Sequence, residues 1–514
     1  MLPRRLTAKM PTSTTPPAGA QSSSQSVIPN AVVDAPQPDL RNGSTPAAET
    51  PERLPTDEVR VSMSRVITAW GFGSAFTSIT AGAIYVAFAR KIGASDFIFG
   101  VLAAAMPLMS FLQVAAARMV ERSGRRKRQM MIAGILGRLL WVVAALLPLA
   151  GQYFPHVLDK HTVLILVFIA VMAAGAGQTF GYPAFFSWMA DLVPQRVRPT
   201  FFARRMQVGT CVALAAAVAG GWIADAYSSL TVYCVILALA GLAGLVEMLI
   251  FSGVREPQTM IDNNEPLPPL LESFAEPLRD PAIRVFLFFC IIIMFSAGLF
   301  GPFVWLHALE RLDFSKTLTN LILVVAPSLG VAWSARFWSD IIKRHGNRPV
   351  MRLGAAGLIM VPLSWLVAQP DSAGPLQSWG MLFVITFIVG ILAGGLDLAS
   401  QNLVTGLSPH IPRSTMTALY FIACGLSYAG GTWSGGALAE WLGDKPYSFL
   451  GAQLTNYHVL FLAALLLRLI NAVFVAPRLR EPTATSTIAT VKDIVPEFAH
   501  SFGARLVRSF RVRD

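Results

Sequence analysis

Long apolar runs recur along the chain from Val66 onward, and short polar segments separate them. Each run is close to the roughly twenty residues that an α-helix needs to cross a bilayer. We predict about twelve helices, at Val66–Ala89, Phe97–Ala116, Met130–Ala150, Val163–Met189, Val208–Ala226, Leu230–Phe251, Val285–Leu306, Leu318–Trp338, Val350–Val367, Trp379–Leu403, Met416–Leu438 and Tyr457–Val475. The pattern therefore indicates an all-α membrane protein with two groups of six transmembrane helices.

The same pattern divides the chain into five segments. Residues 1–60 are rich in Pro, Ser, Thr and Ala, which predicts a disordered tail. Residues 61–251 and 284–476 hold the two groups of helices, and the polar segment 252–283 joins them. In the second tail, 477–514, apolar residues from Val491 to Phe510 recur at helical spacing among basic ones. They predict an amphipathic helix that lies on the membrane, or one that docks on the protein's own surface.

Composition and charge placement support a membrane protein. Hydrophobic residues make up 54% of the chain and the net charge is +12, which in a soluble protein would favour nucleic-acid binding. Here the basic residues gather in alternate turns between the apolar runs, at 118–128, 196–205, 255–279 and 343–352. This asymmetry predicts that both termini are cytoplasmic in a plasma (inner) membrane. We expect a monomer in the lipid bilayer that binds no nucleic acid.

The turn between the second and third runs carries a spaced motif. It reads Ala117-Arg-Met-Val-Glu-Arg-Ser-Gly-Arg-Arg-Lys-Arg128, with the key positions Glu121, Arg122, Gly124, Arg125 and Arg126. This resembles the loop Gly-x-Leu-Ala-Asp-Arg-x-Gly-Arg-Arg between the second and third helices of the major facilitator superfamily. A degenerate copy follows the eighth run, where Arg344, Gly346 and Arg348 fit the pattern and Lys343 replaces the acid.

The resemblance implies two six-helix bundles that rock about a central cavity. It also implies that the acid of the first loop, Glu121, contacts the start of the eleventh helix near Arg413 when the cytoplasmic side is closed. The first, fourth, seventh and tenth helices would line the cavity. On the first, fourth and tenth helices of the chain, the polar and aromatic candidates are Trp70, Thr77, Gln178, Tyr182, Gln401 and Asn402. Ordinary helix packing is the alternative explanation for each.

The two halves also repeat each other in sequence. Leu192-Val-Pro194 followed by Arg198 matches Leu407-Ser-Pro409 followed by Arg413. At the same offset, Gly220-Gly221 and Asp225 match Gly435-Gly436 and Glu440. Matches in register across two helices indicate an internal duplication.

Two charged residues inside the apolar runs are the strongest candidates for chemistry. Asp397 in the tenth run could bind a coupling proton or sodium ion or a solute group, or form a structural ion pair. Arg138 in the third run could hold an anionic solute or pair with Asp397. The sequence contains no nucleotide-binding loop, zinc motif or nucleophile elbow, so we expect neither an enzyme nor a cofactor or metal.

These features predict a secondary active transporter of a small organic solute, coupled to a proton or sodium gradient. One alternative is an efflux pump for amphipathic compounds, although two motifs associated with drug/proton antiporters are missing. Another is a receptor on the same fold that binds its solute without moving it.

Overall fold

The computed structural model describes residues 56–194, 197–257, 274–368, 375–406, 413–443, 447–449, 452–481 and 484–493. Most of the predicted N-terminal tail, much of the segment 252–283 and the predicted amphipathic helix beyond residue 493 lie outside these residues. The first helix begins at Thr56, so it already includes the end of the segment 1–60 that the composition predicts as tail.

The N-terminal half consists of helices that follow the first six apolar runs. They are α1 (Thr56–Thr80), α2 (Ala83–Lys91), α3 (Asp96–Ala103), α4 (Ala105–Leu108), a 3-10 turn (Met109–Phe111), α5 (Leu112–Ser123), α6 (Arg126–Tyr153), α7 (Lys160–Leu192), α8 (Arg198–Ala226) and α9 (Leu230–Ser252). The first span bends by 45° between α1 and α2, and the second bends by 48° after α3. The sequence pattern does not predict either bend.

The C-terminal half follows the other six runs. Its elements are a 3-10 turn (Pro277–Arg279), α11 (Pro281–Leu306), a π-helical turn (His307–Arg311), α12 (Lys316–Asn320), a second π turn (Leu321–Val325), α13 (Ala326–His345), α14 (Asn347–Gly357), α15 (Met360–Val367), α16 (Pro375–Gly406), α17 (Arg413–Leu442), α18 (Asn456–Ile470), a third π turn (Asn471–Val475) and a 3-10 turn (Ala476–Arg478). An unpredicted antiparallel hairpin, β1 (Tyr447–Phe449) and β2 (Ala452–Leu454), precedes α18 with Tyr447 opposite Leu454.

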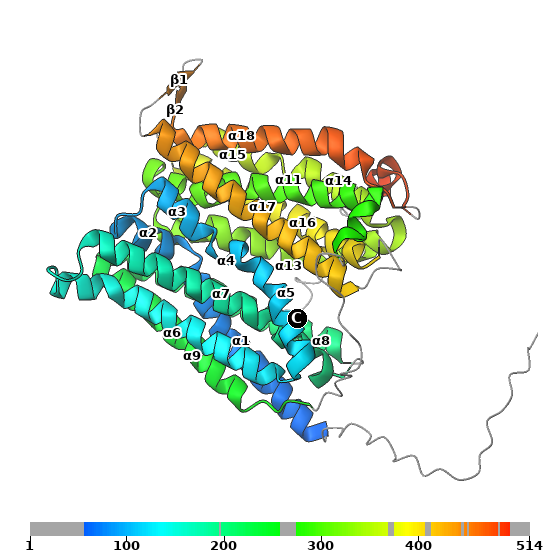
Figure 1. The fold of residues 1–514 in the computed structure, drawn as a ribbon. Helices are drawn as coiled ribbons and strands as arrows, with labels where there is room; N and C mark the ends of the chain where they lie inside the picture. The colour runs from blue at the N-terminus through cyan, green and yellow to red at the C-terminus, as the bar shows by residue number, and fades with distance from the viewer. Residues whose placement is uncertain are drawn as a thin grey trace, which may run out of the picture. The chain divides into compact units, whose positions relative to one another are not determined.

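The predicted number of membrane spans agrees with these helices. Nine helical segments are long and apolar enough to cross a bilayer, and the two bent pairs raise the count to eleven within the described residues. Helix α17 has 30 residues, is rich in Gly, Ser and Thr, and is not among these eleven. Its length is about 45 Å, so it is also long enough to cross. The all-α membrane fold is confirmed (Figure 1).

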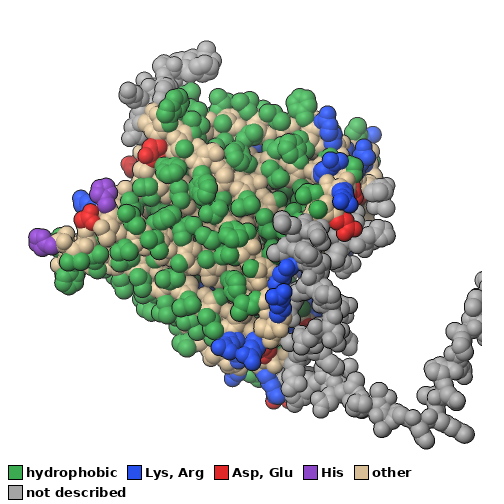
Figure 2. Space-filling view, viewed as in Figure 1, with side chains coloured by type: hydrophobic (Ala, Val, Ile, Leu, Met, Phe, Trp, Pro, Cys, Tyr) green, Lys and Arg blue, Asp and Glu red, His purple; other side chains and the backbone are tan. Residues whose placement is uncertain are grey.

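Within each half, the helices pack against one another. In the N-terminal half, α6 lies against α7 and α9, and α1 packs against both α8 and α9. In the C-terminal half, α11 packs against α17 and α18, and α16 packs against α13 and α14. Large apolar side chains such as Leu136 and Leu239 remain exposed. Figure 2 shows that hydrophobic side chains cover much of the face in view. Such an apolar surface is favourable in contact with lipid and unfavourable in contact with water.

Basic residues mark one end of the helices. Arg125, Arg204, Arg255 and Arg344 lie where α6, α8 and α14 begin and where α9 and α13 end. In Figure 2, most Lys and Arg side chains lie along the right and lower edges, and apolar side chains cover most of the face in view. We call this end the basic side and the other end of the helices the opposite side.

Each of the two motif loops on the basic side contains a turn that requires glycine. Gly124 ends α5 with φ +61°, and Gly346 lies between α13 and α14 with φ +85°. A side chain at either position would be strained, because L-residues rarely adopt positive φ. Both copies of the motif therefore place a glycine with positive φ between two helices, but the turns differ, because ψ is −3° at Gly124 and 177° at Gly346.

A carboxylate caps the helix that follows each of these turns. Glu256 accepts a hydrogen bond from the Lys127 backbone N–H at 2.9 Å, and Glu481 accepts one from the Arg348 N–H at 2.7 Å. The first amides of a helix have no partner within the helix, and the helix dipole favours a negative charge there. Both acids stand in a repeated Arg-Glu-Pro sequence, which the sequence analysis did not use.

The beginning of the C-terminal tail docks on the same turn. Arg348 donates to the carbonyl oxygens of Ala484 and Thr485, at 3.3 and 3.0 Å. The Thr485 N–H donates to the His345 carbonyl oxygen at 3.0 Å, and the His345 ring lies 3.3 Å from the Asp493 carboxylate. Residues 484–493 therefore lie against this turn, while the choice between the two alternatives for the predicted amphipathic helix stays open, because most of that helix is outside the described residues.

We predict that Glu481→Ala will release the tail from this turn. Glu481 accepts from the Arg348 N–H and from the Asn347 side-chain amide. Losing this charged acceptor should cost about 1.5–3 kcal/mol. Trypsin cleavage after Lys492, followed by mass spectrometry of the intact protein, should become at least several-fold faster. Glu276→Ala, which removes an exposed acid elsewhere, is the control. Equal cleavage rates in the two variants would show that Glu481 does not hold the tail.

Candidate functional site

Close contacts join the two halves on the opposite side. Helix α17 packs against α3 and α4, and α12 packs against α8. A Cβ atom at Gly436 would lie 2.9 Å from the Asp96 carbonyl oxygen, and one at Gly221 would lie 3.0 Å from the Thr317 backbone. These two glycines, which match in the internal repeat, allow a helix of one half to approach the helix start of the other.

Two acids from the same repeat bind those helix starts. Glu440 of α17 accepts from the Phe97 N–H at 2.9 Å and from the Ser95 hydroxyl at 2.6 Å, at the start of α3. Asp225 of α8 accepts from the N–H groups of Lys316 and Thr317, at 2.8 and 3.0 Å, at the start of α12. The acids and helix starts belong to different halves, so each contact links one half to the other.

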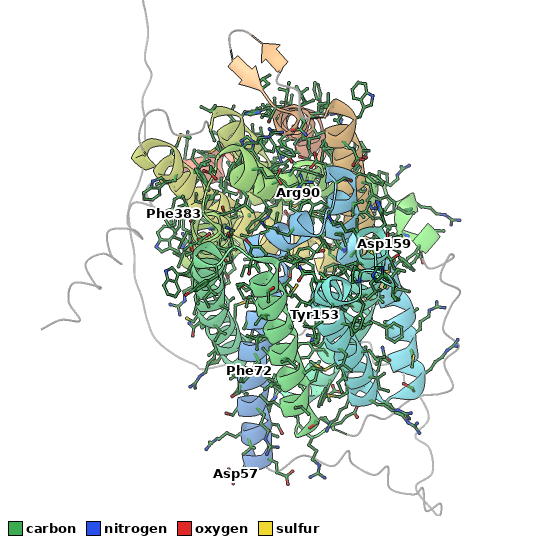
Figure 3. The ribbon with its side chains drawn as sticks, turned by 90° about the vertical axis from the view of Figure 1, so that its left-hand side faces the viewer. Asp57, Phe72, Arg90, Tyr153, Asp159 and Phe383 are labelled. Atoms are coloured by element: carbon green, nitrogen blue, oxygen red, sulfur yellow. The ribbon has the colours of Figure 1, made fainter. Side chains whose placement is uncertain are left out.

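A network around Arg90 adds to these contacts. We call the contacts that Asp225, Glu440 and Arg90 make between the two halves the closure. The Arg90 side chain donates to Glu310 of the other half at 2.7 Å and also binds Asp96. The Tyr457 hydroxyl and the Asn456 amide both donate to Asp96, at 3.0 Å. Figure 3 shows Arg90 among the crowded side chains between the halves, and Asp57, at the other end of the first span, far below it. The sequence analysis missed this network because it treated the weakly charged turns only as topology signals.

These contacts place the closure on one side. Within the described parts of the chain, both ion pairs that join the halves, Arg90–Glu310 and Lys316–Asp225, lie on the opposite side. Each of the other ion pairs among the described residues joins two residues of the same half.

A buried ion pair lies inside the N-terminal half. The guanidinium of Arg138 on α6 is 2.9 Å from the Glu247 carboxylate on α9, and both side chains are less than a tenth exposed. Arg138 also lies 4.8 Å from the centre of the Phe76 ring. The suggested pairing of Arg138 with Asp397 is therefore wrong. The sequence analysis overlooked Glu247, although it is the only charged residue in its apolar run.

Arg205 connects this pair to the predicted cavity residues. Its guanidinium stacks 3.9 Å from the Trp70 ring and interacts electrostatically with Glu247 and Tyr182. The Gln178 amide donates to the Tyr182 hydroxyl at 3.4 Å. The structure thus gathers Trp70, Gln178 and Tyr182 around an arginine that sequence reasoning did not single out. The Thr77 hydroxyl, in contrast, donates to carbonyls of its own helix.

Several donors in this cluster have no acceptor. The Trp70 indole N–H and the Nε–H groups of Arg138 and Arg205 are buried and bind no atom of the described residues. A buried donor without a partner costs about 1–3 kcal/mol. The cluster combines aromatic rings, an amide and an arginine, and it is therefore a candidate binding surface.

Asp397 lies in the other half. It is exposed on α16, and so are Gln401 and Asn402 on the following turn. Its neighbours include Cys290 of α11 and Tyr420 of α17. No hydrogen bond or ion pair reaches the Asp397 carboxylate from the residues that the structure describes. Because a charged side chain avoids lipid, its exposure indicates that it faces water.

The predicted gating residues have mixed surroundings. Arg122, Arg125 and Arg344 are exposed. Arg126 is buried and forms an ion pair with Asp191 at the end of α7, at 2.7 Å, which ties two helices of one half together. The side chains of Glu121 and Arg413 lie outside the described part, so their predicted contact stays a prediction.

Comparison with known proteins agrees with this architecture. The family model of the Major Facilitator Superfamily matches residues 61–375 and 286–511. The chain belongs to the major facilitator superfamily. It is therefore an integral membrane transporter of this superfamily. No curated protein matches the chain.

Solved structures of the superfamily share the fold. The nucleoside transporter NupG is 13% identical with a TM-score of 0.62, over 82% of this chain and 99% of that one. A bacterial homologue of the human lysosomal transporter Spinster, solved in an inward-facing and unoccupied conformation, is 14% identical with a TM-score of 0.61, over 84% of this chain and 100% of that one. These identities show similarity of fold alone.

We predict that the double variant Asp225→Asn, Glu440→Gln will open the superfamily fold on the opposite side. Losing a charge at each helix start should cost about 1 kcal/mol per site, or about 30-fold in the closed-to-open ratio together. Distances between spin labels at Lys91 and Trp441, measured by pulsed electron resonance, should lengthen. Asp159→Asn removes a helix-capping acid within one half and is the control. An unchanged distance distribution in the double variant would contradict the capping role.

We predict that Glu247→Met will lower thermal stability strongly, because it leaves Arg138 charged and buried. Breaking one partner of a buried pair costs about 3–5 kcal/mol, whereas replacing both with apolar residues is often neutral. The melting temperature in detergent should therefore fall in the single variant and recover in Arg138→Met, Glu247→Met. If the double variant is as unstable as the single one, the ion pair is not the cause.

Proposed function

We propose that this protein is a secondary active transporter that moves a small organic solute by alternating access and is driven by protons. The observation that carries the proposal is the Asp397 carboxylate within a membrane span, which is exposed and has no partner among the described residues. Asp397 lies roughly 14 Å before the end of α16 at Gly406, well inside the hydrocarbon thickness.

A proton is the coupling ion that the surroundings of Asp397 favour. A carboxylate inside a membrane is costly unless it pairs, faces water or takes up a proton. Its neighbours Cys290 and Tyr420 supply no positive charge. When the cavity closes and water leaves, protonation is the simplest way to discharge Asp397. The carboxylate would then carry one proton across for each cycle.

The cluster around Arg205 suggests the chemistry of the solute. Trp70 and Tyr182 offer aromatic faces, while Gln178, the Trp70 indole and Arg205 offer hydrogen-bond donors. Such a surface suits a planar organic molecule that carries acceptor oxygens. We propose that the solute binds between this cluster and Asp397. The similarity to NupG, a nucleoside transporter, makes nucleosides the first compounds to test.

The orientation of the protein in the membrane follows from the charge asymmetry. The basic side should face the cytoplasm of a plasma (inner) membrane, with both termini there, because Lys and Arg favour cytoplasmic loops. With that orientation, the closure by Asp225, Glu440 and Arg90 would lie outside, which supports the proposal of a state open toward the cytoplasm. In the outward-open state, Glu121 would contact the start of α17, a helix N-terminus that favours an acid.

We predict that Asp397→Asn will separate solute exchange from proton-driven accumulation. A thermal-shift screen with nucleosides, sugars, amino acids, organic acids and amphipathic cations would first identify a ligand. In liposomes, the variant should exchange that ligand at a rate within a few-fold of wild type, but a pH gradient should no longer drive accumulation. Asp340→Asn, an exposed acid paired with Lys343, is the control.

Two results would contradict this assignment. One is accumulation in Asp397→Asn that responds to a pH gradient as wild type does. The other is wild-type accumulation that follows a sodium gradient and ignores a pH gradient.

A further inference from the structure

A long groove runs along the outside of the N-terminal half between α1 and α8. Its volume is about 1050 Å³, and its walls include Ile67 and Phe72 of α1 and Val208 and Val212 of α8. Ala243 of α9 borders it, beside the exposed Leu242 and Val246. Phe72 is itself 40% exposed and lies along the outside of α1 in Figure 3. The groove therefore opens toward the membrane and is separate from Asp397.

Two arginines line the half of the groove that lies nearer the basic side. Arg60 is in the second turn of α1, and Arg204 is in the second turn of α8. Both side chains are exposed, and neither has a hydrogen bond or ion pair with any residue that the structure describes. Farther along, the walls are mainly apolar, although Ser64 and Thr68 of α1 also line them. The groove thus combines unpaired positive charge at the membrane surface with an apolar channel below it.

The length of the groove fits one lipid leaflet. Its α1 wall extends from Arg60 to Ala75, about 22 Å at 1.5 Å per residue. Half of the hydrocarbon core is about 15 Å thick, and the headgroup region adds several more ångströms. A lipid with its phosphate at Arg60 would reach the far end with its acyl chain.

We propose that this groove binds one anionic phospholipid from the leaflet on the basic side. Its phosphate lies between the guanidinium groups of Arg60 and Arg204, and one acyl chain runs along Ile67, Phe72 and Val208. Arginines in basic pockets between membrane helices hold lipid phosphates through charge and hydrogen bonds. A bound lipid would join α1 to α8, and α8 carries Asp225 of the closure.

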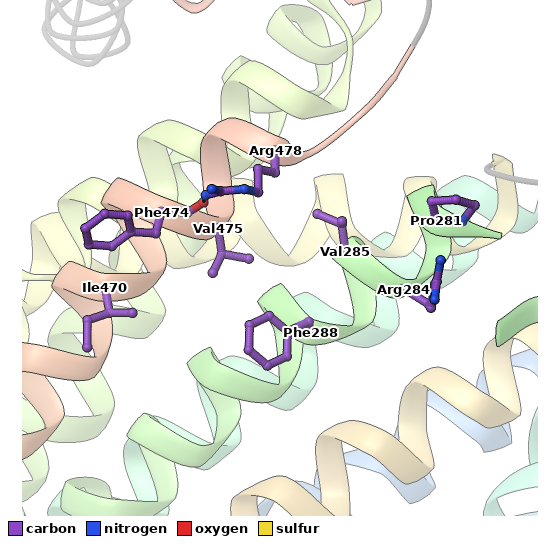
Figure 4. Close-up of a pocket in the computed structure, with 8 residues that line it drawn as sticks. All are labelled: Pro281, Arg284, Val285, Phe288, Ile470, Phe474, Val475 and Arg478. Atoms are coloured by element: carbon purple, nitrogen blue, oxygen red, sulfur yellow. Dashed lines mark hydrogen bonds between the residues drawn. The ribbon is translucent and has the colours of Figure 1, made fainter. Parts of the chain in front are cut away.

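A second groove is also lined by two arginines, but in a different arrangement. It lies between α11 and the end of the last span, has a volume of about 650 Å³ and is lined by Arg284 and Arg478 (Figure 4). Figure 4 shows these arginines on opposite walls, with Arg478 turned back toward Phe474. Arg478 already donates to the Phe474 carbonyl oxygen. We therefore expect weaker lipid binding there, and this groove supplies a matched control.

Native mass spectrometry of the full-length protein tests the proposal. The detergent-purified protein is titrated with phosphatidylglycerol and with phosphatidylcholine of the same acyl chains. Wild type should bind one phosphatidylglycerol more tightly than the rest and more tightly than phosphatidylcholine. Arg60→Ala, Arg204→Ala should weaken that site about 30-fold, since each basic residue near a membrane surface contributes about 1 kcal/mol. Arg284→Ala, Arg478→Ala should leave it unchanged.

A groove-filling variant separates this site from general attraction to an anionic surface. Val208→Trp keeps both arginines but blocks the path of the acyl chain, so the tight lipid should be lost while the melting temperature stays near wild type. Equal binding of the two lipids, equal loss in the two arginine variants, or wild-type lipid binding by Val208→Trp would each overturn the proposal. A disulfide between cysteines placed at Val212 and in the segment 1–55 would overturn it too, because the chain itself would then fill the groove.

Discussion

Capping of helix starts by carboxylates from distant parts of the chain is the interaction on which this structure depends. The first amides of a helix have no acceptor within the helix, and the low dielectric of a membrane protein makes that lack costly. Glu256 and Glu481 cap α6 and α14 within their own halves. Asp225 and Glu440 cap α12 and α3 across the halves. The same physical contact therefore stabilises each bundle and holds the two bundles together.

The two kinds of cap have different consequences for movement. A cap within a half persists when the halves rotate, and it keeps the bundle rigid. A cap across the halves has to break when the opposite side opens. Water can then hydrate both the carboxylate and the amides, so the net cost of breaking each cap is far smaller than its strength in a dry environment. Glycines such as Gly221 and Gly436 let the acids of one half reach the helix starts of the other.

The charged residues inside the spans follow the same electrostatic rule with opposite outcomes. Arg138 and Glu247 are buried and neutralise each other, while Arg205 adds a positive charge next to Trp70. Asp397 is exposed, and no partner among the described residues neutralises it. A buried pair stabilises a fixed arrangement, whereas an unpaired acid that faces water is able to change its charge. The functional proposal rests on this difference between the two halves.

The sequence by itself indicated the all-α membrane fold, the glycines of the motif turns and the duplication, because apolar length, glycine positions and repeats are local properties of the chain. It also indicated Trp70, Gln178 and Tyr182, which the structure brings together. Only the tertiary structure decided the partners: Arg138 binds Glu247, and Arg90 binds Glu310, 220 positions away. Which charges meet depends on how the helices pack, and the apolar faces that determine the packing are similar on every span.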